Sequence, residues 1–222
     1  MPLKVIAALG DSVTNGYWDS ETFQGWFGRL AAKILAAYPP LDENGKVKKG
    51  AEKFGFVNIS YDGDRVCDAV HRLAAEGCSR DIDILIIRIG ANDLIRSPNP
   101  DSPMDLSEHC RGEYWHKLLE LAKKNIKTII VLDTLPRYQE TEVAYGWFDA
   151  PMFEPNADKI AYNEQIAEIC KSHNVPFLRF YDRWAKRDLS EYYVDYGHPN
   201  AKGHQLIADE LYEEIEKLGI LK

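Results

Sequence analysis

A serine, an aspartate and a histidine in this sequence have the types and the spacing that nucleophilic catalysis uses. Ser12 directly follows a short apolar run, residues 5–9, which ends at Gly10-Asp11-Ser12. Far along the chain, Asp195 and His198 lie three positions apart in a turn, so the carboxylate can accept a hydrogen bond from Nδ1 while Nε2 faces Ser12. A serine hydroxyl is a weak nucleophile until an imidazole takes its proton.

Two further strand ends carry groups that can donate hydrogen bonds. Gly63 follows the second expected strand, residues 55–60, and Asn92 follows the third, residues 83–89. If the first strand is central and the other two flank it, all three turns meet around Ser12. Ligands bind at the carboxyl ends of strands in open α/β sheets, so this edge is the expected site.

Five strands alternate with helices along the chain. Each expected strand is a short apolar run, and each expected helix has apolar residues at helical spacing. The first expected strand ends just before Ser12, and the other four cover residues 55–60, 83–89, 127–132 and 176–180. The expected helices cover residues 23–38, 66–76, 105–125, 156–173 and 201–218. Residues 13–22, 41–54 and 137–155 are expected to be irregular, and Asp105 or Ser107 caps the third helix. The pattern predicts one three-layer α/β domain over residues 1–222, with a parallel sheet.

Composition excludes several classes of protein. The chain has 222 residues, and its net charge of −8, with scattered basic residues, argues against a nucleic-acid or anionic-membrane surface. It has no apolar stretch of membrane-spanning length and no signal-peptide pattern, so a cytoplasmic protein is the simplest expectation, although a protein whose signal peptide has been removed looks the same. The four cysteines form no CxxC pair and are interpreted as reduced thiols, with no metal site.

Four polar segments together resemble the four sequence blocks of the SGNH (GDSL) hydrolase superfamily. They are residues 10–12, 58–63 and 90–93, and Asp195-x-x-His198-Pro-Asn, in the order that the family has. The resemblance implies a flavodoxin-like five-stranded parallel sheet in the order 2-1-3-4-5, and ester hydrolysis without a cofactor. Val13 replaces the leucine of the GDSL motif, and Asp62 precedes Gly63 where the family often has serine.

The resemblance also implies a role for each matching residue. Ser12 is the expected nucleophile, His198 the general base and Asp195 the residue that orients the histidine. The backbone N–H groups of Ser12 and Gly63 and the side-chain amide of Asn92 are the expected oxyanion hole. Such fixed donors stabilise the charge of a tetrahedral intermediate and contribute about 10²–10³ each in rate.

The leading hypothesis is a serine esterase for small or medium acyl esters, acetyl among them. Trp147, Phe148 and Phe153 belong to an aromatic-rich stretch after the fourth strand, and are expected either to wall the acyl pocket or to pack on the domain's own helices. The expected partner is a small-molecule ester, and oligomeric state is left open.

Two other functions compete with the esterase hypothesis. A metal-dependent phosphoesterase would use Asp11, Asp64, Asn92 and His198 as ligands. A non-catalytic carbohydrate-binding protein with a degenerate hydrolase fold is the other alternative. In the esterase reading, Asp11, Asp64 and Asp93 hold loops by hydrogen bonding, and Arg88, on an otherwise apolar strand, pairs with a carboxylate.

Overall fold

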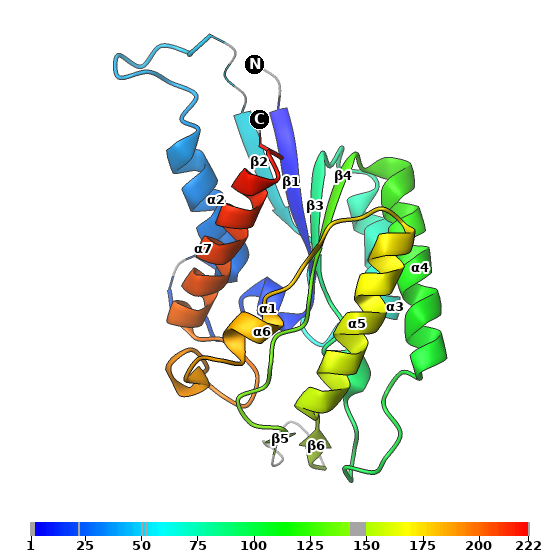
Figure 1. Cartoon of the computed structure of the whole chain (residues 1–222). Coiled ribbons are helices and arrows are strands. Elements are labelled where there is room, and N and C mark those ends of the chain that lie inside the picture. The colour runs from blue at the N-terminus through cyan, green and yellow to red at the C-terminus, as the bar shows by residue number, and fades with distance from the viewer. Residues whose placement is uncertain (1–2, 22, 50, 52, 143–149, 222) are drawn as a thin grey trace.

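A five-stranded parallel sheet forms the centre of the molecule (Figure 1). The computed structural model describes residues 3–21, 23–49, 51, 53–142 and 150–221. The strand order is β2-β1-β3-β4-β7, which is the predicted order 2-1-3-4-5 when the central strands are numbered along the chain. These strands are β1 (Leu3–Gly10), β2 (Lys53–Asn58), β3 (Ile84–Arg88), β4 (Thr128–Leu132) and β7 (Phe177–Leu178).

Helices cover both faces of the sheet, as the three-layer prediction requires (Figure 1). On one face lie α2 (Gly25–Ala37) and α7 (Ala201–Lys217); on the other lie α3 (Val66–Arg72), α4 (Glu108–Asn125) and α5 (Asn156–Ser172). The interior strand β1 is apolar and buried from Val5 onward because each of its faces meets a helix layer. Ile6 and Ala8 pack with the α2 and α7 side, whereas Ala7 and Leu9 pack with the α3 and α4 side.

The register of β1 explains why its end becomes a site. Ala8 is paired with Asn58 of β2 and with Ile86 of β3, so the three strands end at the same edge. The turns that follow these strands carry Ser12, Gly63 and Asn92. The role of Gly63 and Asn92 as oxyanion donors beside Ser12 stays a prediction.

Several element boundaries differ from the sequence-based expectation. Residues 13–22 are not wholly irregular, because Ser12–Asn15 form a short helix, α1, capped by Asp11. The helix expected over residues 66–76 ends as α3 at Arg72 and continues as a π-helical turn, η1 (Leu73–Gly77). The third long helix begins at Glu108, and Ser107 is its cap, since its side chain accepts the N–H of Cys110.

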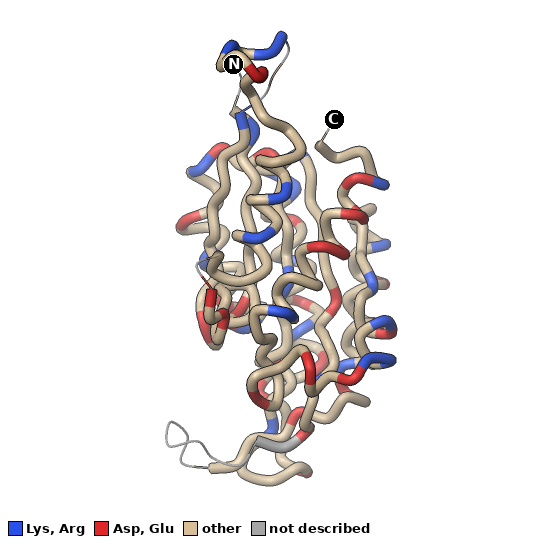
Figure 2. The backbone as a smooth tube through the Cα atoms, turned by 90° about the vertical axis from the view of Figure 1, so that its left-hand side faces the viewer, with Lys and Arg blue, Asp and Glu red and all other residues tan. Residues whose placement is uncertain are grey.

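The remaining segments are short. The stretch after β4 contains a two-stranded antiparallel pair, β5 (Thr141–Glu142) with β6 (Met152–Phe153). The shorter helical turns are η2 (Asn92–Leu94), α6 (Tyr181–Trp184) and η3 (Leu189–Glu191). Figure 2 shows acidic and basic residues interspersed along the chain. Of the helices in the described part of the chain, none has the length and apolar content that crossing a bilayer requires.

Candidate active site

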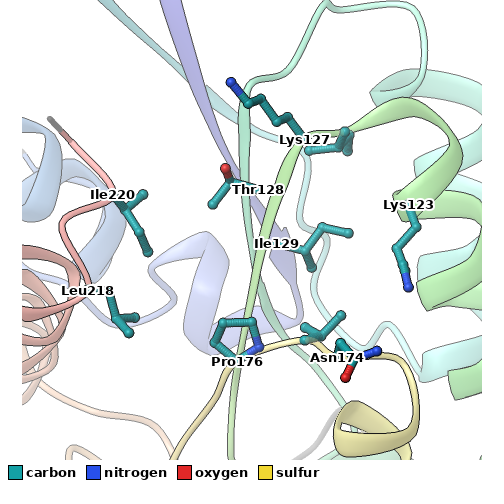
Figure 3. A pocket seen from close by; sticks show the side chains of 10 residues that line it. Lys123, Lys127, Thr128, Ile129, Asn174, Pro176, Leu218 and Ile220 are labelled. Carbon is teal, nitrogen blue, oxygen red and sulfur yellow. The ribbon is translucent and has the colours of Figure 1, made fainter.

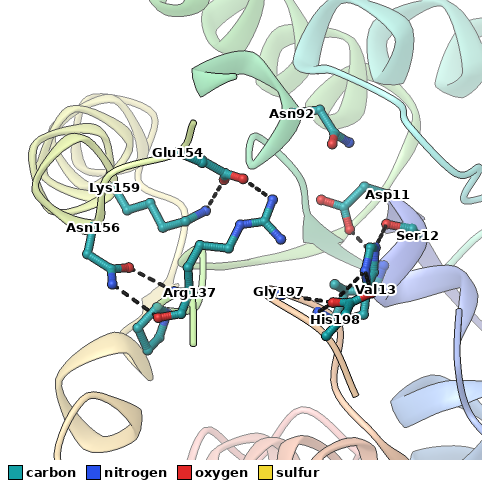
Figure 4. A network of polar contacts seen from close by, with 12 residues as sticks. Asp11, Ser12, Val13, Asn92, Arg137, Glu154, Asn156, Lys159, Gly197 and His198 are labelled. Carbon is teal, nitrogen blue, oxygen red and sulfur yellow. Dashed lines mark hydrogen bonds and ion pairs between the residues drawn. The ribbon is translucent and has the colours of Figure 1, made fainter. Parts of the chain in front are cut away.

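Ser12, His198 and Asp195 form a hydrogen-bonded chain at the carboxyl edge of the sheet; Figure 4 shows Ser12 beside His198. The Ser12 Oγ lies 3.0 Å from Nε2 of His198. On the far side of the ring, Nδ1 lies 2.8 Å from Oδ2 of Asp195. A carboxylate only accepts, so Nδ1 carries the proton in this arrangement and Nε2 is left to accept from the serine hydroxyl.

The turn that presents Ser12 is tightly packed. Asp11 caps α1, because its Oδ1 accepts the N–H of Val13 at 3.1 Å, and it also accepts from the Arg88 guanidinium at 3.2 Å. This buried pair confirms the expectation that Arg88 meets a carboxylate. A Cβ on Gly10 would lie 2.3 Å from the carbonyl oxygen of Arg88, so only glycine permits this close approach of β1 to β3.

The Asp195 carboxylate is held in its ionised form by several donors. Its Oδ1 accepts the backbone N–H groups of Gly197, at 2.9 Å, and His198, at 2.8 Å. Burial alone would raise the pKa of Asp195, but the hydrogen bonds from the His198 ring and these N–H groups outweigh it, and the pKa lies below its ordinary value. A fixed negative charge therefore faces the imidazole.

The two other expected oxyanion donors lie on turns that are fastened to each other. Nδ2 of Asn92 donates to the carbonyl oxygen of Asp64 at 2.9 Å, which connects the turn after β3 to the turn after β2. Gly63 has φ +79, a conformation that favours glycine, and its surroundings are open. Asn15 of α1 donates to the Asp62 carboxylate at 2.9 Å, so the residue that departs from the family pattern ties the Gly63 turn to the Ser12 helix.

The predicted acyl-pocket residues are placed only in part. Trp147 and Phe148 lie outside the described residues. Phe153 lies in β6, half-buried, and its backbone exchanges two hydrogen bonds of 2.9 Å with Arg96. The pocket role of these three residues stays a prediction.

A buried cluster of charged side chains beside the site was missed by the sequence analysis (Figure 4). Glu154 lies between Arg137 and Lys159 and forms an ion pair with each. Burial, together with the nearby guanidinium groups, lowers the pKa of Lys159 well below its ordinary value. The signal in the sequence was weak: Arg137 follows the apolar end of β4, and Lys159 occupies a buried position of α5.

Arg137 also packs against the loop that carries His198. Its guanidinium lies 4.5 Å from the centroid of the Tyr196 ring, and a Cβ on Gly197 would overlap it. The backbone N–H of Tyr138 donates to the carbonyl oxygen of Tyr196 at 2.8 Å. The residues that follow β4 thus pack against the loop that carries Tyr196, Gly197 and His198 and hold it in place.

A second contact missed by the sequence analysis involves Trp18. Its indole Nε1 donates to Oδ2 of Asp195 at 2.9 Å. The neighbouring Tyr17 ring packs on the His198 ring, with 4.9 Å between centroids. An aromatic pair in an otherwise polar loop, six residues after the serine, was the only signal in the sequence.

The carboxylates proposed as metal ligands in the phosphoesterase alternative are engaged elsewhere. Asp11 is paired with Arg88, and Asp64 accepts from Arg72 at 2.6 Å. Within the described ranges, no group of three or more His, Cys, Asp or Glu side chains is arranged to hold a metal ion. Two guanidinium groups at these carboxylates disfavour a cation site there.

A separate hollow of about 320 Å³ lies at the opposite edge of the sheet, where β4 begins (Figure 3). It is lined by aliphatic side chains and by polar ones that include Lys123, Lys127 and Asn174. Its position at the amino ends of the strands separates it from Ser12.

Comparisons with known proteins relate most of the chain to a family of lipases and acylhydrolases. A sequence model of the GDSL-like Lipase/Acylhydrolase family matches residues 8–206. The uncharacterized protein YpmR of Bacillus subtilis (strain 168) is 24% identical over 237 residues, covering 98% of this chain and 84% of that protein. Among solved structures, Axe2, an acetylxylan esterase from Geobacillus stearothermophilus, is 18% identical with a TM-score of 0.70, covering 96% of this chain and 94% of the other. The lipase/acylhydrolase from Enterococcus faecalis is 19% identical with a TM-score of 0.67 and covers 96% of both chains.

Proposed function

The chain belongs to the GDSL-like lipase/acylhydrolase family, a family of carboxylic ester hydrolases, and from that membership we propose that it hydrolyses short acyl esters through Ser12, His198 and Asp195. The observation that carries the proposal is the continuous hydrogen-bonded chain of these three side chains, with heavy-atom separations of 3.0 and 2.8 Å. Nucleophile, base and orienting carboxylate are within reach of one another before any substrate binds.

In the first half of the proposed reaction, Ser12 Oγ attacks the carbonyl carbon of the ester as its proton passes to Nε2 of His198. The tetrahedral intermediate carries negative charge on the former carbonyl oxygen. The N–H of Ser12 lies in the first turn of α1, where a helix offers it no acceptor, and it can donate to that oxygen with the Gly63 N–H and the Asn92 amide. The bond to the alcohol then breaks, and His198 returns the proton to the leaving oxygen.

In the second half, a water molecule attacks the acyl group on Ser12. His198 takes one proton from the water and gives it to Oγ as the bond between Ser12 and the acyl carbon breaks. The products are a carboxylic acid and the free serine. Asp195 remains ionised throughout, because its role is to hold the Nδ1 proton and to stabilise the imidazolium.

The proposed substrate is a small-molecule ester with a short acyl chain. Acetylated carbohydrate is the acyl donor suggested by the structural similarity to an acetylxylan esterase. Trp147, Phe148 and Phe153, if they wall the acyl pocket, would leave room for a short chain and cover it.

The test is a hydrolysis screen over acyl length and acetylated sugars, with Ser12→Ala beside the wild type. We expect Ser12→Ala to lose nearly all turnover and to melt as the wild type does, and a fluorophosphonate to label the wild type at Ser12 alone. Ser20→Ala is the matched control, since that serine is exposed in the segment that follows α1. Full activity of Ser12→Ala, or label on another residue, would refute the assignment. A protein that only binds carbohydrate would turn over none of the esters.

A further inference from the structure

One oxygen of the triad carboxylate has two side-chain donors, and only one of them belongs to the triad. Oδ2 of Asp195 lies 2.8 Å from Nδ1 of His198 and 2.9 Å from Nε1 of Trp18. The other oxygen, Oδ1, accepts the two backbone N–H groups of the same turn and lies 3.1 Å from Nδ1 of His198, farther than Oδ2 does. Without the indole, Oδ2 would have the imidazole as its only close donor within the described chain.

The backbone at Trp18 is held in an unfavourable conformation that directs the indole to this place. Its φ is 63°, in the left-handed region that bulky side chains rarely adopt. The residues on both sides are fixed by other contacts: the Tyr17 N–H donates to the Ser12 carbonyl at 2.9 Å, and the buried Asp19 carboxylate pairs with Arg29 at 2.7 Å. The chain cannot relax at Trp18 without giving up one of these contacts.

The indole also encloses the histidine together with Tyr17. The Tyr17 ring centroid lies 5.1 Å from that of Trp18 and 4.9 Å from that of His198, so the three rings form one cluster. About half of the Trp18 side chain nevertheless stays exposed, at 49%. A hydrogen bond at this position can therefore be removed without opening a cavity in the core.

We propose that Trp18 is a positioning residue for the triad: its indole N–H fixes Oδ2 of Asp195, and thereby the plane of the carboxylate and the orientation of the His198 ring. The inference rests on the proposed function, because it assigns Asp195 and His198 their catalytic roles. With the indole in place, Oδ2 is held by a donor outside the triad; without it, Oδ2 would be held only by the His198 ring that the carboxylate has to orient. A strained backbone conformation is the kind of feature that persists at functional sites.

The first experiment removes the N–H donor of the indole. Trp18 is replaced by benzothienylalanine, in which sulfur takes the place of the indole N–H, and separately by Phe. The control is Tyr138→Phe, which removes one hydroxyl from another half-exposed aromatic residue and keeps its backbone bond to the histidine loop. With a short-chain ester we expect kcat to fall about three- to thirtyfold in both Trp18 variants, with KM changed less than about twofold, because the bond acts on the triad and not on the substrate. An unchanged kcat, or a raised KM with unchanged kcat, would overturn the proposal.

The second experiment observes the bond without using activity. In a ¹H–¹⁵N spectrum, the indole N–H of Trp18 should exchange slowly with solvent in the wild type and much faster in Asp195→Ala. Equal exchange in the two proteins would overturn the inference and leave the esterase assignment standing. Slow exchange in the wild type, in a protein that turns over no ester, would instead overturn the proposed function and leave the hydrogen bond standing.

Discussion

Burial of His204 is expected to make the free energy of unfolding fall as the pH falls. The side chain is fully buried, its Nε2 lies 3.4 Å from the Tyr17 carbonyl oxygen, and its Nδ1 has no partner among the described residues. Burial lowers the pKa of His204 from 6.5 to about 4. The unfolded chain therefore takes up the proton first as the pH falls. The stabilisation is complete above pH 6.5 and is lost progressively down to about pH 4.

The magnitude follows from the two pKa values. With 6.5 in the unfolded chain and about 4 in the folded one, the free energy of unfolding falls by about 2 kcal/mol between about pH 8 and pH 5, and by about 3 kcal/mol once both states are protonated. Asp93 and Asp133 act in the opposite sense, because burial raises the pKa of each to about 7 and the folded state takes up their protons first. The profile of the wild type alone would mix these effects.

The assay is urea unfolding of the wild type and His204→Gln at about pH 8, 6.5 and 5. Glutamine keeps an N–H donor for the Tyr17 carbonyl but does not titrate, so the two carboxyl contributions cancel in the difference between the proteins. We expect the variant to be the less stable protein at pH 8 and the difference to shrink by about 2 kcal/mol at pH 5. Parallel profiles of the two proteins would refute the argument that a buried neutral His204 causes the acid sensitivity.

Three further predictions concern the site. Asn92→Ala should lower kcat by about 10²–10³ with little change in KM, since its amide is needed in the transition state; a raised KM with normal kcat would make it a substrate-binding residue. In the same steady-state assay, His198→Ala should be as damaging as Ser12→Ala, while Asp195→Ala should be milder because Tyr17 still packs on the ring. Acetyl to butyryl esters should be turned over faster than octanoyl esters, and Trp147→Ala should shift that preference toward longer chains. A profile that the substitution leaves unchanged would exclude this role.

Much of the fold was predictable because its signals are local. The apolar runs at β1, β3 and β4 are buried on both faces, so they show as uninterrupted hydrophobic segments, and the glycine or polar residue after each run gives its end. The sequence offered Asp105 and Ser107 as caps of the third long helix, and the structure has Ser107. The order of the strands came from the family resemblance.

What escaped prediction depends on contacts between distant segments. Arg137 reaches Glu154, which pairs with Lys159 five positions further on, only because two segments distant in sequence meet in the fold. Trp18 and Asp195 are separated by 177 positions, and the left-handed conformation that brings them together is not one that a tryptophan favours. β7 is likewise short because it pairs with β4 over only two residues.

The hydrogen bond between Ser12 and His198 joins positions 186 residues apart, and this separation has a consequence for how the protein comes to be active. The nucleophile is in place once β1 has paired in the sheet, but the base arrives only with the segment that leads into α7, which must pack against α2. A chain whose final helix has not yet docked therefore holds all five sheet strands, but the loop that carries His198 lacks the helix that holds it in place. After dilution from denaturant, recovery of ester turnover should lag behind recovery of sheet structure. The rate at which turnover returns would then report how fast α7 docks against α2.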